Sequence, residues 1–424
     1  MIKFLFKGIV RDRSRSTLPI IIISLGVFLT ILLSGYIRGM LGDMVVQNAN
    51  MDTGHVKIMT RAYAENKEQL PNDLGLLEVE ELKQNLALEY PNLDFTPRIK
   101  FGGLMDAPDE NGETKGQGPV AGIALDLFHQ ESGEAERMNL KNSLISGSIP
   151  DQAGEVLLGH EFTEKLGLSL GDEITFVGST INGSMTFQNF VISGTIKFGS
   201  PVMDRGAMLI DISDAQQMLD MPNGAGELLG FLKSNSYFDE EATEIANDFN
   251  TKYSSSEDEF SSVMYTLKQQ NNLASLLDIM DSFSAIFIFI FILAMSIVLW
   301  NTGLLGGLRR YNEFGIRLAL GESKGAIYRT LIYEAILIGA IGSTVGTALG
   351  IAATYYWQIT GLDISSMTKN AGILMPSIIR AKVTPDLFYI GFIPGLLAML
   401  FGNMLSGIGI YKRETATLFK ELEV

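Results

Sequence analysis

The apolar residues of this chain gather into four long runs that contain no charged side chain. The runs cover 17–37, 282–308, 335–362 and 387–411. A helix needs roughly 20 apolar residues to cross the ~30 Å hydrocarbon core of a bilayer, and each run is long enough. The pattern therefore predicts four membrane-spanning helices. We place them at 18–38, 279–308, 328–356 and 386–411.

Basic side chains indicate which ends of these helices face the cytoplasm, because short cytoplasmic loops carry an excess of lysine and arginine. Residues 1–17 hold five basic side chains against one acid, and the loop after the second run is similarly basic. We expect cytoplasmic segments at 1–17, 309–327 and 412–424. We expect extracytoplasmic segments at 39–278 and 357–385. The first run exceeds the ~7–15-residue core of a signal peptide, and no A-x-A-like cleavage site follows it, so we expect a retained anchor.

The extracytoplasmic region alternates short strands with turns and a few helices, which is typical of an α+β domain. We expect strands at 55–59, 98–105, 120–125, 155–158, 173–177, 187–197 and 207–212. We expect helices at 78–88, 161–166 and 213–219, the last with Ser213 as its N-cap. We expect a polar, mobile loop at 106–118. Helices at 40–50 and 267–281 would form a stalk. The predicted fold class is therefore an α-helical membrane protein with four transmembrane helices. Its α+β domain would lie on a helical stalk between helices 1 and 2.

Charge and composition narrow the classes of function. The net charge of −16 is the sum of two unlike parts, because residues 40–278 hold 38 acidic and 15 basic side chains while the rest of the chain is net basic. An acidic domain of this kind argues against nucleic-acid binding, since nothing would neutralise the phosphates. The chain has no cysteine and only three histidines, so we expect neither disulfides nor a metal centre.

The loop between the second and third runs has an amphipathic pattern. Tyr311, Phe314 and Leu318 recur at helical spacing and form one apolar face. Glu313 and Arg317 are an i, i+4 pair on another face, and Gly321 supplies a C-terminal stop. The residues alone leave two interpretations open: the helix contacts a cytosolic partner, or it lies on the bilayer surface.

Several sequence motifs point to catalysis but lack the context that it needs. Residues 167–171 match G-x-S-x-G around Ser169, yet that motif requires a strand before the serine and a helix after it, and here the expected order is reversed. An isolated S-x-x-K match at 366–369 and an acidic run at 257–259 are better explained as solvated loops. No G-x-x-x-x-G-K-[ST] occurs. We therefore predict no catalytic, cofactor-binding or metal-binding residue in this chain.

Two features of the third run concern packing. Gly342, Gly346 and Gly350 form a smooth stripe that lets another helix approach closely; the stripe serves either the bundle within the chain or a seam between two subunits. Glu334 lies near the cytoplasmic start of the same helix. It is either an anchor solvated by headgroups or half of a buried pair with a loop arginine such as Arg310.

The loop pattern resembles the R-x-x-E-[FI]-G-x-[LR]-x-A-x-G…E signature of ABC-transporter permeases of the MacB/FtsX/LolC-type superfamily. The matching run is Arg310, Glu313, Phe314, Gly315, Ile316, Arg317, Ala319, Leu320 and Gly321, with Glu334 downstream. The resemblance implies that this segment is the coupling helix that contacts a separate ATPase subunit. In that picture Phe314, Leu318 and the Glu313–Arg317 pair make the contact.

A second block, S-G-x-x-P…G-E-V-L-L-G…L-G-L-x-x-G-D-x-[IV] at 146–174, is similar to the periplasmic core domain of the same superfamily. Residues 43–144 match it least. The resemblance implies a permease subunit of the bacterial inner membrane that is not itself an enzyme. Its partners would be an ATPase subunit, which binds the ATP and Mg²⁺, and a second permease subunit that is identical or homologous.

The resemblance also implies mechanotransmission, in which ATP-driven closure in the cytoplasm moves the stalk and the periplasmic domain. Three functions compete: release of lipoproteins from the inner membrane, efflux of peptides, toxins or macrolides, and control of cell-wall hydrolases. Chain length and the two-part domain favour lipoprotein release, with a lipoprotein substrate and a periplasmic chaperone or adaptor as further partners. A membrane-anchored extracytoplasmic sensor is the alternative from another class.

Overall fold

The computed structural model describes residues 13–108, 113–198, 204–234, 236–255, 257–309, 311–363 and 378–412. The chain divides into two compact units. The bundle unit comprises Met1–Asp43, Leu276–Asp363 and Ile378–Val424. The head unit comprises Met44–Ser275 and Ile364–Ser377. Residues 1–12 of the first expected cytoplasmic segment and 413–424 of the last lie outside the described residues.

Long helices build the bundle unit. They are α2 (Arg13–Asn48), α11 (Leu273–Arg309), α13 (Lys324–Thr360) and α15 (Leu387–Lys412), with the short α12 (Tyr311–Ala319) between α11 and α13. Within the described residues, three helices are long and apolar enough to cross a membrane, at Ser16–Thr53, Lys324–Thr360 and Leu387–Leu405. The described apolar stretch of α11, Ala285–Asn301, is shorter, so the fourth span stays a prediction. The short strands β11 (Leu362–Asp363) and β12 (Ile378–Ile379) pair beyond α13.

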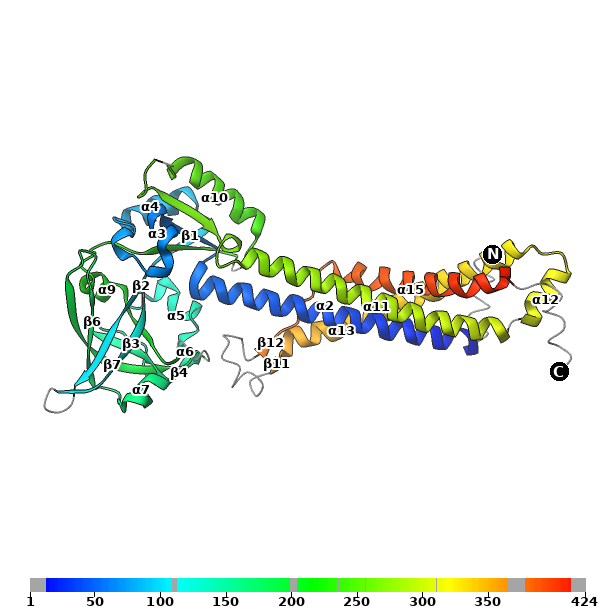
Figure 1. The fold of residues 1–424 in the computed structure, drawn as a ribbon, viewed down its shortest axis with the longest axis horizontal. Coiled ribbons are helices and arrows are strands. Elements are labelled where there is room, and N and C mark those ends of the chain that lie inside the picture. The colour runs from blue at the N-terminus through cyan, green and yellow to red at the C-terminus, as the bar shows by residue number, and fades with distance from the viewer. Residues whose placement is uncertain are drawn as a thin grey trace. The chain divides into compact units, whose positions relative to one another are not determined.

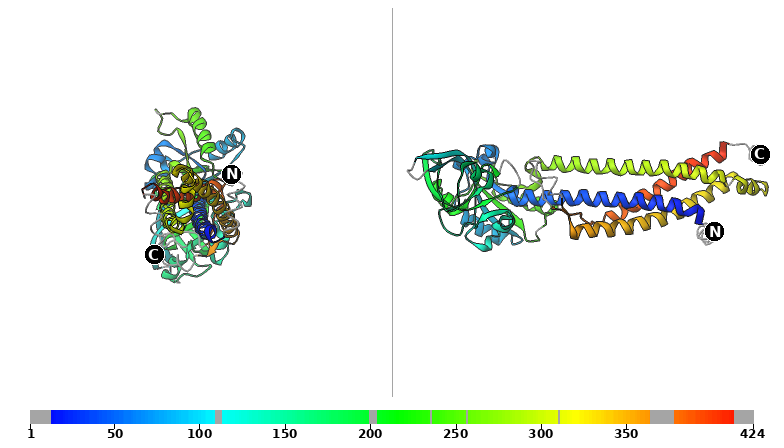
Figure 2. Two further views of the ribbon diagram at one scale, coloured as in Figure 1. Left: turned by 90° about the vertical axis from the view of Figure 1, so that its right-hand side faces the viewer. Right: turned by 90° about the horizontal axis from the view of Figure 1, so that it is seen from below.

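Glycines let α13 and α15 pack closely against α2, and the views agree that the long helices run alongside one another (Figures 1 and 2). A Cβ atom on Gly346 would lie 2.6 Å from the Ser24 carbonyl oxygen of α2. A Cβ atom on Gly342 would lie 2.9 Å from the Cβ of Ile23 in α2, and one on Gly350 would lie 2.9 Å from the Cβ of Ile31 in α2. The Ser24 hydroxyl also donates to the Gly342 carbonyl oxygen at 3.0 Å. The structure therefore places the glycine stripe at a helix contact within the chain.

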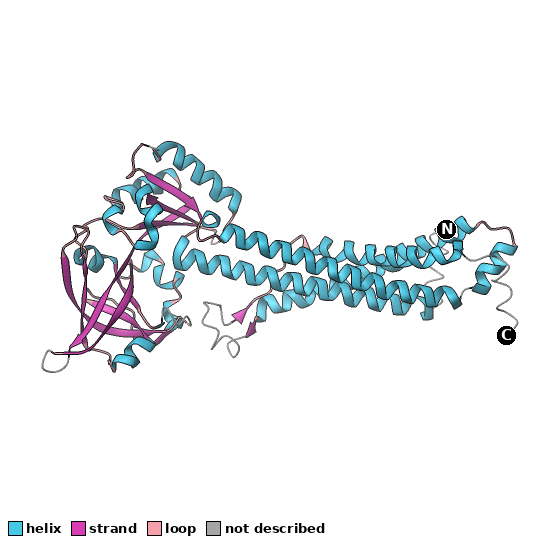
Figure 3. Cartoon of the chain, in the orientation of Figure 1, coloured by secondary structure: helices cyan, strands magenta, loops and turns pink. Residues whose placement is uncertain are grey.

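All strands from β1 to β10 belong to one sheet of the head unit (Figure 3). Their order is β10-β1-β9-β2-β3-β8-β5-β7-β4, and β6 pairs with β2 and β7. The strands are β1 (Val56–Thr60), β2 (Leu93–Pro108), β3 (Thr114–Leu125), β4 (Leu144–Gly147), β5 (Glu155–Gly159), β6 (Glu173–Ser179), β7 (Met185–Ile196), β8 (Ala207–Asp211), β9 (Glu227–Leu232) and β10 (Ser262–Thr266). Strand β2 pairs with β9 along its first half and with β3 along its second, so it is common to both halves of the sheet.

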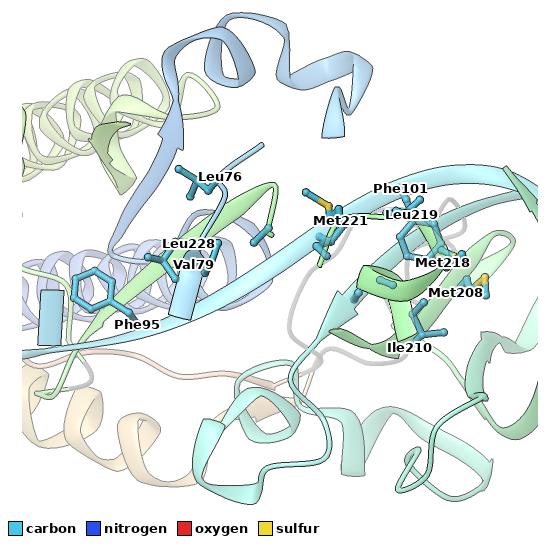
Figure 4. Close-up of a cluster of buried hydrophobic side chains, with 14 of the residues drawn as sticks. Leu76, Val79, Phe95, Phe101, Met208, Ile210, Met218, Leu219, Met221 and Leu228 are labelled. Atoms are coloured by element: carbon cyan, nitrogen blue, oxygen red, sulfur yellow. The ribbon is translucent and has the colours of Figure 1, made fainter. Parts of the chain in front are cut away.

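Helices cover this sheet and close its core. They are α3 (Arg61–Asn66), α4 (Val79–Glu89), α5 (Glu134–Arg137), α6 (Leu140–Ser143), α7 (His160–Leu166), α9 (Ile212–Met218) and α10 (Asp239–Tyr253). Figure 4 shows side chains of β2, β8, β9 and α9, including Phe101, Met208, Met218 and Leu228, in one buried hydrophobic cluster. Burial of such side chains is the main favourable contribution to folding.

The structure confirms most of the expected elements of the head and corrects three. One is the helix expected at 267–281, which instead begins at Leu273, after the 3₁₀ turn η5 (Leu267–Gln269) and two asparagines with positive φ. The expected strands at 55–59, 155–158, 173–177, 187–197 and 207–212 correspond to β1, β5, β6, β7 and β8 within two residues. The expected mobile loop at 106–118 is wrong at both ends, because β2 continues to Pro108 and β3 starts at Thr114, with Asp106 opposite Gln117; residues 109–112 lie outside the described part. Its glycines serve packing: a Cβ on Gly118 would lie 2.8 Å from the Phe162 ring of α7.

The N-cap of α9 is Asp211, not Ser213 as expected. The Asp211 side chain accepts the Ser213 N–H at 2.9 Å. Its other oxygen accepts the Leu127 N–H at 2.9 Å and the Phe128 N–H at 3.2 Å. A carboxylate accepts several hydrogen bonds at once, so this residue serves both the helix start and the loop beside it.

His55 immediately precedes β1 and is buried in its neutral form. Its Nδ1 accepts the Leu232 N–H at 2.9 Å. Burial, helped by the nearby positive charge of Arg137, lowers the pKa of His55 to about 4. In the unfolded chain an ordinary histidine has a pKa of about 6.5.

We expect the His55→Asn variant to lose part of the pH dependence of stability. Below pH ~6.5 His55 is protonated in the unfolded state but stays neutral in the native state. The free energy of unfolding therefore falls by about 2–3 kcal/mol as the pH drops from ~6.5 towards ~4. Asparagine keeps an acceptor for Leu232 but does not titrate. Thermal melting of the full chain at pH 7 and pH 4.5 measures the difference, and equal losses in both proteins would contradict the assignment.

Candidate functional site

The segment from Arg309 to Lys324 folds into a short helix with a defined end. Helix α12 ends in a glycine cap, in which the Glu322 N–H donates to the Arg317 carbonyl oxygen and the Gly321 N–H to that of Leu318, each at 3.0 Å. This is the Schellman pattern, which needs a left-handed residue after the helix. Gly321 supplies it with φ of 90°, as the sequence predicts.

The cap places Glu322 beside Arg317. The Arg317 guanidinium donates from Nε and Nη2 to the two carboxylate oxygens of Glu322, at 2.6 and 2.7 Å. These bonds, followed by the charges of Glu322, Glu313 and Glu334, raise the pKa of Arg317. A planar guanidinium matches one carboxylate best through two parallel bonds, and Glu322 provides them, while the charge of Glu313 contributes less than that of Glu322 to the raised pKa of Arg317.

The apolar surface of this segment lies partly on residues that the helical pattern did not single out. Ile316 is 60% exposed and Leu320 is 82% exposed, while Leu318 is half-buried. Ala319 is exposed beside them. Phe314 lies within α12, and its side chain is outside the described part of the structure, as is Arg310 altogether. The spacing of Ile316 and Leu320 by four residues was the available signal for this pair.

No described contact explains why position 315, inside α12, is a glycine. A Cβ atom built on it meets no described atom within 4 Å, and its backbone is ordinary helix. Packing among the described residues therefore leaves room for a larger side chain. Gly315 itself is buried, and the side chains of Tyr311, Asn312 and Phe314 beside it lie outside the described part.

Glu334 lies ten residues into α13 and is half-buried. The expected partner Arg310 is outside the described residues, but the charge of Glu334 contributes to the raised pKa of Arg317. Ser323 caps the start of α13, since its hydroxyl accepts the Ala326 N–H at 3.3 Å. Among the described residues, Arg317 is thus a basic group that the charges of Glu322, Glu313 and Glu334 all reach.

No described group of histidine and acidic side chains is arranged to hold a metal ion. Ser169 lies in the turn between α7 and β6, where its N–H donates to Asp172 at 2.8 Å. Helix therefore precedes strand, the reverse of the order that a catalytic serine elbow requires. Residues 366–369 lie outside the described part. An open cavity of about 440 Å³ in the head, between α4 and β10, is lined by both polar and apolar side chains.

Two family models match the chain. The MacB-like periplasmic core domain matches residues 16–247, which is more than half of the chain. The FtsX-like permease C-terminal family matches residues 285–415, which include α12 and the helices on either side of it.

Individual proteins match over shorter stretches. The lipoprotein-releasing system transmembrane protein LolC of Xylella fastidiosa (strain Temecula1) is 25% identical over 224 residues, which cover 51% of this chain and 52% of that protein. The chain thus spans about half the length of this relative. The macrolide export ATP-binding/permease protein MacB of Campylobacter fetus subsp. fetus (strain 82-40) is 33% identical over 75 residues, 18% of this chain and 12% of that protein.

Among solved structures, the periplasmic region of MacB from Actinobacillus actinomycetemcomitans aligns with 53% of this chain and 94% of its own length. The TM-score is 0.36 and the identity is 9%. A TM-score of this size does not establish a shared fold.

Proposed function

Because this chain belongs to the MacB/FtsX/LolC superfamily of ABC-type permeases, we propose that it couples ATP hydrolysis on a separate subunit to movement outside the cytoplasm. The ATPase subunit would bind ATP and Mg²⁺, since the sequence holds no P-loop motif. The permease would act with a second permease subunit in the bacterial inner membrane. Both termini and α12 would face the cytoplasm, and the head would be periplasmic.

The exposed surface of α12 is the observation that carries this proposal. Ile316 of α12 and Leu320, the residue that follows the helix, present apolar side chains to solvent. The glycine cap and the Arg317–Glu322 pair fix this end of the helix. Fixed geometry lowers the entropy lost on binding. These features are those of a preformed surface on which a protein subunit could dock.

We expect Ile316→Asp and Leu320→Asp each to weaken association with the ATPase subunit. Burying one such side chain contributes about 1.5–3 kcal/mol, so each variant should bind at least about tenfold more weakly. Co-purification of the ATPase with the permease from membranes measures the loss. Leu77→Asp is the matched control, because Leu77 is a leucine in the head with 67% exposure and should leave association unchanged.

Normal co-purification of both α12 variants would refute this contact. Both variants should still insert into the membrane, because neither side chain is buried within the chain. Loss of the protein from membranes would therefore indicate a folding defect, which the control does not share.

The favoured substrate class is a lipoprotein that is released from the inner membrane. The match to the lipoprotein-releasing protein LolC covers 51% of this chain, whereas the match to the macrolide exporter MacB covers 18%. Efflux of peptides, toxins or macrolides is the alternative, supported by the higher local identity to MacB. Capture of a lipoprotein by the purified complex would support the first function, and capture of a periplasmic adaptor would support the second.

A further inference from the structure

The head end of α2 finishes in an uncommon turn. Residues Ala49–Thr53 form a π-helical turn, η1, in which the Gly54 N–H donates to the Ala49 carbonyl oxygen at 2.8 Å. Gly54 has φ of 62° and ends the turn. Such turns are rare and occur frequently at functional sites. They also leave the last carbonyl oxygens of the helix in need of donors from elsewhere.

A buried arginine of β2 supplies those donors. Arg98 is 0% exposed, and its Nη2 and Nη1 donate to the carbonyl oxygens of Asn50 and Met51 at 2.7 and 3.0 Å. Its Nε donates to Glu134 of α5 at 2.7 Å, and Glu134 is also 0% exposed. The planar fork of arginine fits several acceptors at fixed angles. The positive charge also suits the negative end of the helix dipole.

The contact continues from Glu134 into β9. The other carboxylate oxygen of Glu134 accepts a bond from Arg137 Nη1 at 3.1 Å. The Arg137 guanidinium lies 4.4 Å from the centre of the Phe231 ring. The end of α2 is thus connected through buried polar contacts to β2, α5 and β9.

Asp52 of η1 makes a second set of contacts, to strands and to the start of α11. It pairs with Lys57 of β1 at 3.3 Å and with Lys100 of β2. Its other oxygen accepts the Asn271 side-chain N–H at 2.6 Å, two residues before α11 begins. The two chain segments that enter and leave the head are therefore hydrogen-bonded to each other and to the same strands.

We propose that η1 and Arg98 form a rigid joint through which a displacement of α2 is passed to the strands of the head. This inference rests on the proposed function, because it names the residues that would carry movement outward. Arg98 is a positioning residue, since it acts by holding the Asn50 and Met51 carbonyls. A buried ion pair can often be replaced by apolar residues without loss of stability. Stability alone therefore does not explain why Arg98 binds the end of a helix with this geometry, and we infer that its role is to fix the orientation of that end.

The test measures two distances in the full-length chain assembled with its ATPase subunit in lipid. The chain has no cysteine, so cysteine pairs carry spin labels at chosen sites only. Val46 of α2 and Leu88 of α4, both exposed, report the position of α2 relative to the head. Leu25 of α2 and Leu349 of α13, both exposed, report movement among the long helices.

The decisive variant is the double substitution Arg98→Met with Glu134→Leu, which removes both charges and leaves neither one buried alone. In the unmodified protein the distribution of Val46–Leu88 distances should stay narrow with and without ATP, while the mean Leu25–Leu349 distance changes when ATP is added. In the variant the Leu25–Leu349 change and the ATPase rate should persist, and the narrow Val46–Leu88 distribution should be lost on ATP addition. Lys252→Met, in an exposed pair with Glu89, is the control and should behave as the unmodified protein.

Each outcome decides between the two proposals. If the variant keeps a narrow distribution of Val46–Leu88 distances while its Leu25–Leu349 distance still changes, the joint is overturned and the proposed function stays intact. No change of the Leu25–Leu349 distance in the unmodified protein overturns both. Should the double variant fail to fold, Arg98→Lys decides, because a single ammonium group cannot hold both carbonyls and the carboxylate in the same fixed geometry; it should also broaden the distribution.

Discussion

Gly346→Leu is expected to break the contact between α13 and α2 and to destabilise the bundle unit by about 3 kcal/mol or more, the upper part of the range for overpacking. A Cβ atom there would lie 2.6 Å from the Ser24 carbonyl oxygen and 2.8 Å from the Val27 Cβ. The first of these atoms is backbone, so no side-chain rotation relieves the clash. The two helices must separate, and Ile23, Val27 and Ile31, each 0% exposed, would lose close contacts.

Thermal unfolding of the purified chain in detergent measures this effect, with Val345→Leu as the control. Val345 precedes the glycine on the same helix and is 42% exposed, so added volume there meets lipid or detergent. A Gly346→Leu protein that melts like the control would contradict the observed packing. Unchanged melting combined with loss of a permease dimer would instead assign the stripe to a seam between subunits.

The membrane helices could be predicted from sequence because their signal is local. A long uncharged run is sufficient evidence for a buried or membrane-embedded helix, and α2, α13 and α15 each contain such a run. The small-residue spacing of Gly342, Gly346 and Gly350 likewise predicts a helix contact. It does not say which helix makes that contact, since this depends on how helices far apart in the chain fold together.

The strands that were missed depend on distant partners. Strand β9 is buried at all six positions, so it lacks the alternation of apolar and polar residues that marks a half-exposed strand. Strand β10 pairs with β1, some 200 residues earlier. The ends of the expected loop at 106–118 were wrong for a different reason: β2 and β3 are consecutive strands, and their pairing extends into a stretch whose glycine, proline and charged residues are typical of a loop.

The candidate site was predicted in outline and corrected in detail. The helix around Phe314 and its stop at Gly321 follow from periodicity and from the conformational freedom of glycine. The pairing of Arg317 with Glu322 does not, because a helical projection treats Glu322 as lying beyond the helix. The cap turns the chain back and brings the two side chains within 2.6 Å. The exposure of Ile316 and Leu320 also required the fold.

Charged side chains buried in the head could not be predicted from sequence, since the residues that pair are scattered along the chain. Lys57, Lys100 and Glu227 come from three different strands, and only the register of β1, β9 and β2 brings them together. Lys57 is 2% exposed and Glu227 is 3% exposed, with 3.0 Å between Lys57 Nζ and Glu227 Oε2. Glu227 lies 3.1 Å from Lys100 as well.

Glu227→Leu is expected to destabilise the head by about 3–5 kcal/mol, because it leaves a buried lysine with one carboxylate fewer. Burial lowers the pKa of Lys57, and the charge of Glu227 opposes that shift. Without Glu227 the pKa of native Lys57 should fall further below its unfolded value of ~10.4. The unfolded chain then holds more protons than the native one, so the variant should regain stability as the pH rises from 7 towards 10.

Denaturant unfolding of the full chain at pH 7 and pH 9.5 measures both effects, and Lys57→Met combined with Glu227→Leu provides the decisive comparison. Removing both partners leaves no unpaired charge between them, and apolar replacement of a buried pair is often neutral or stabilising. The double variant should therefore recover most of the stability that Glu227→Leu loses, without the gain at high pH. If the two substitutions were simply additive, the loss would come from cavity and packing changes, and the buried pair would contribute nothing of its own.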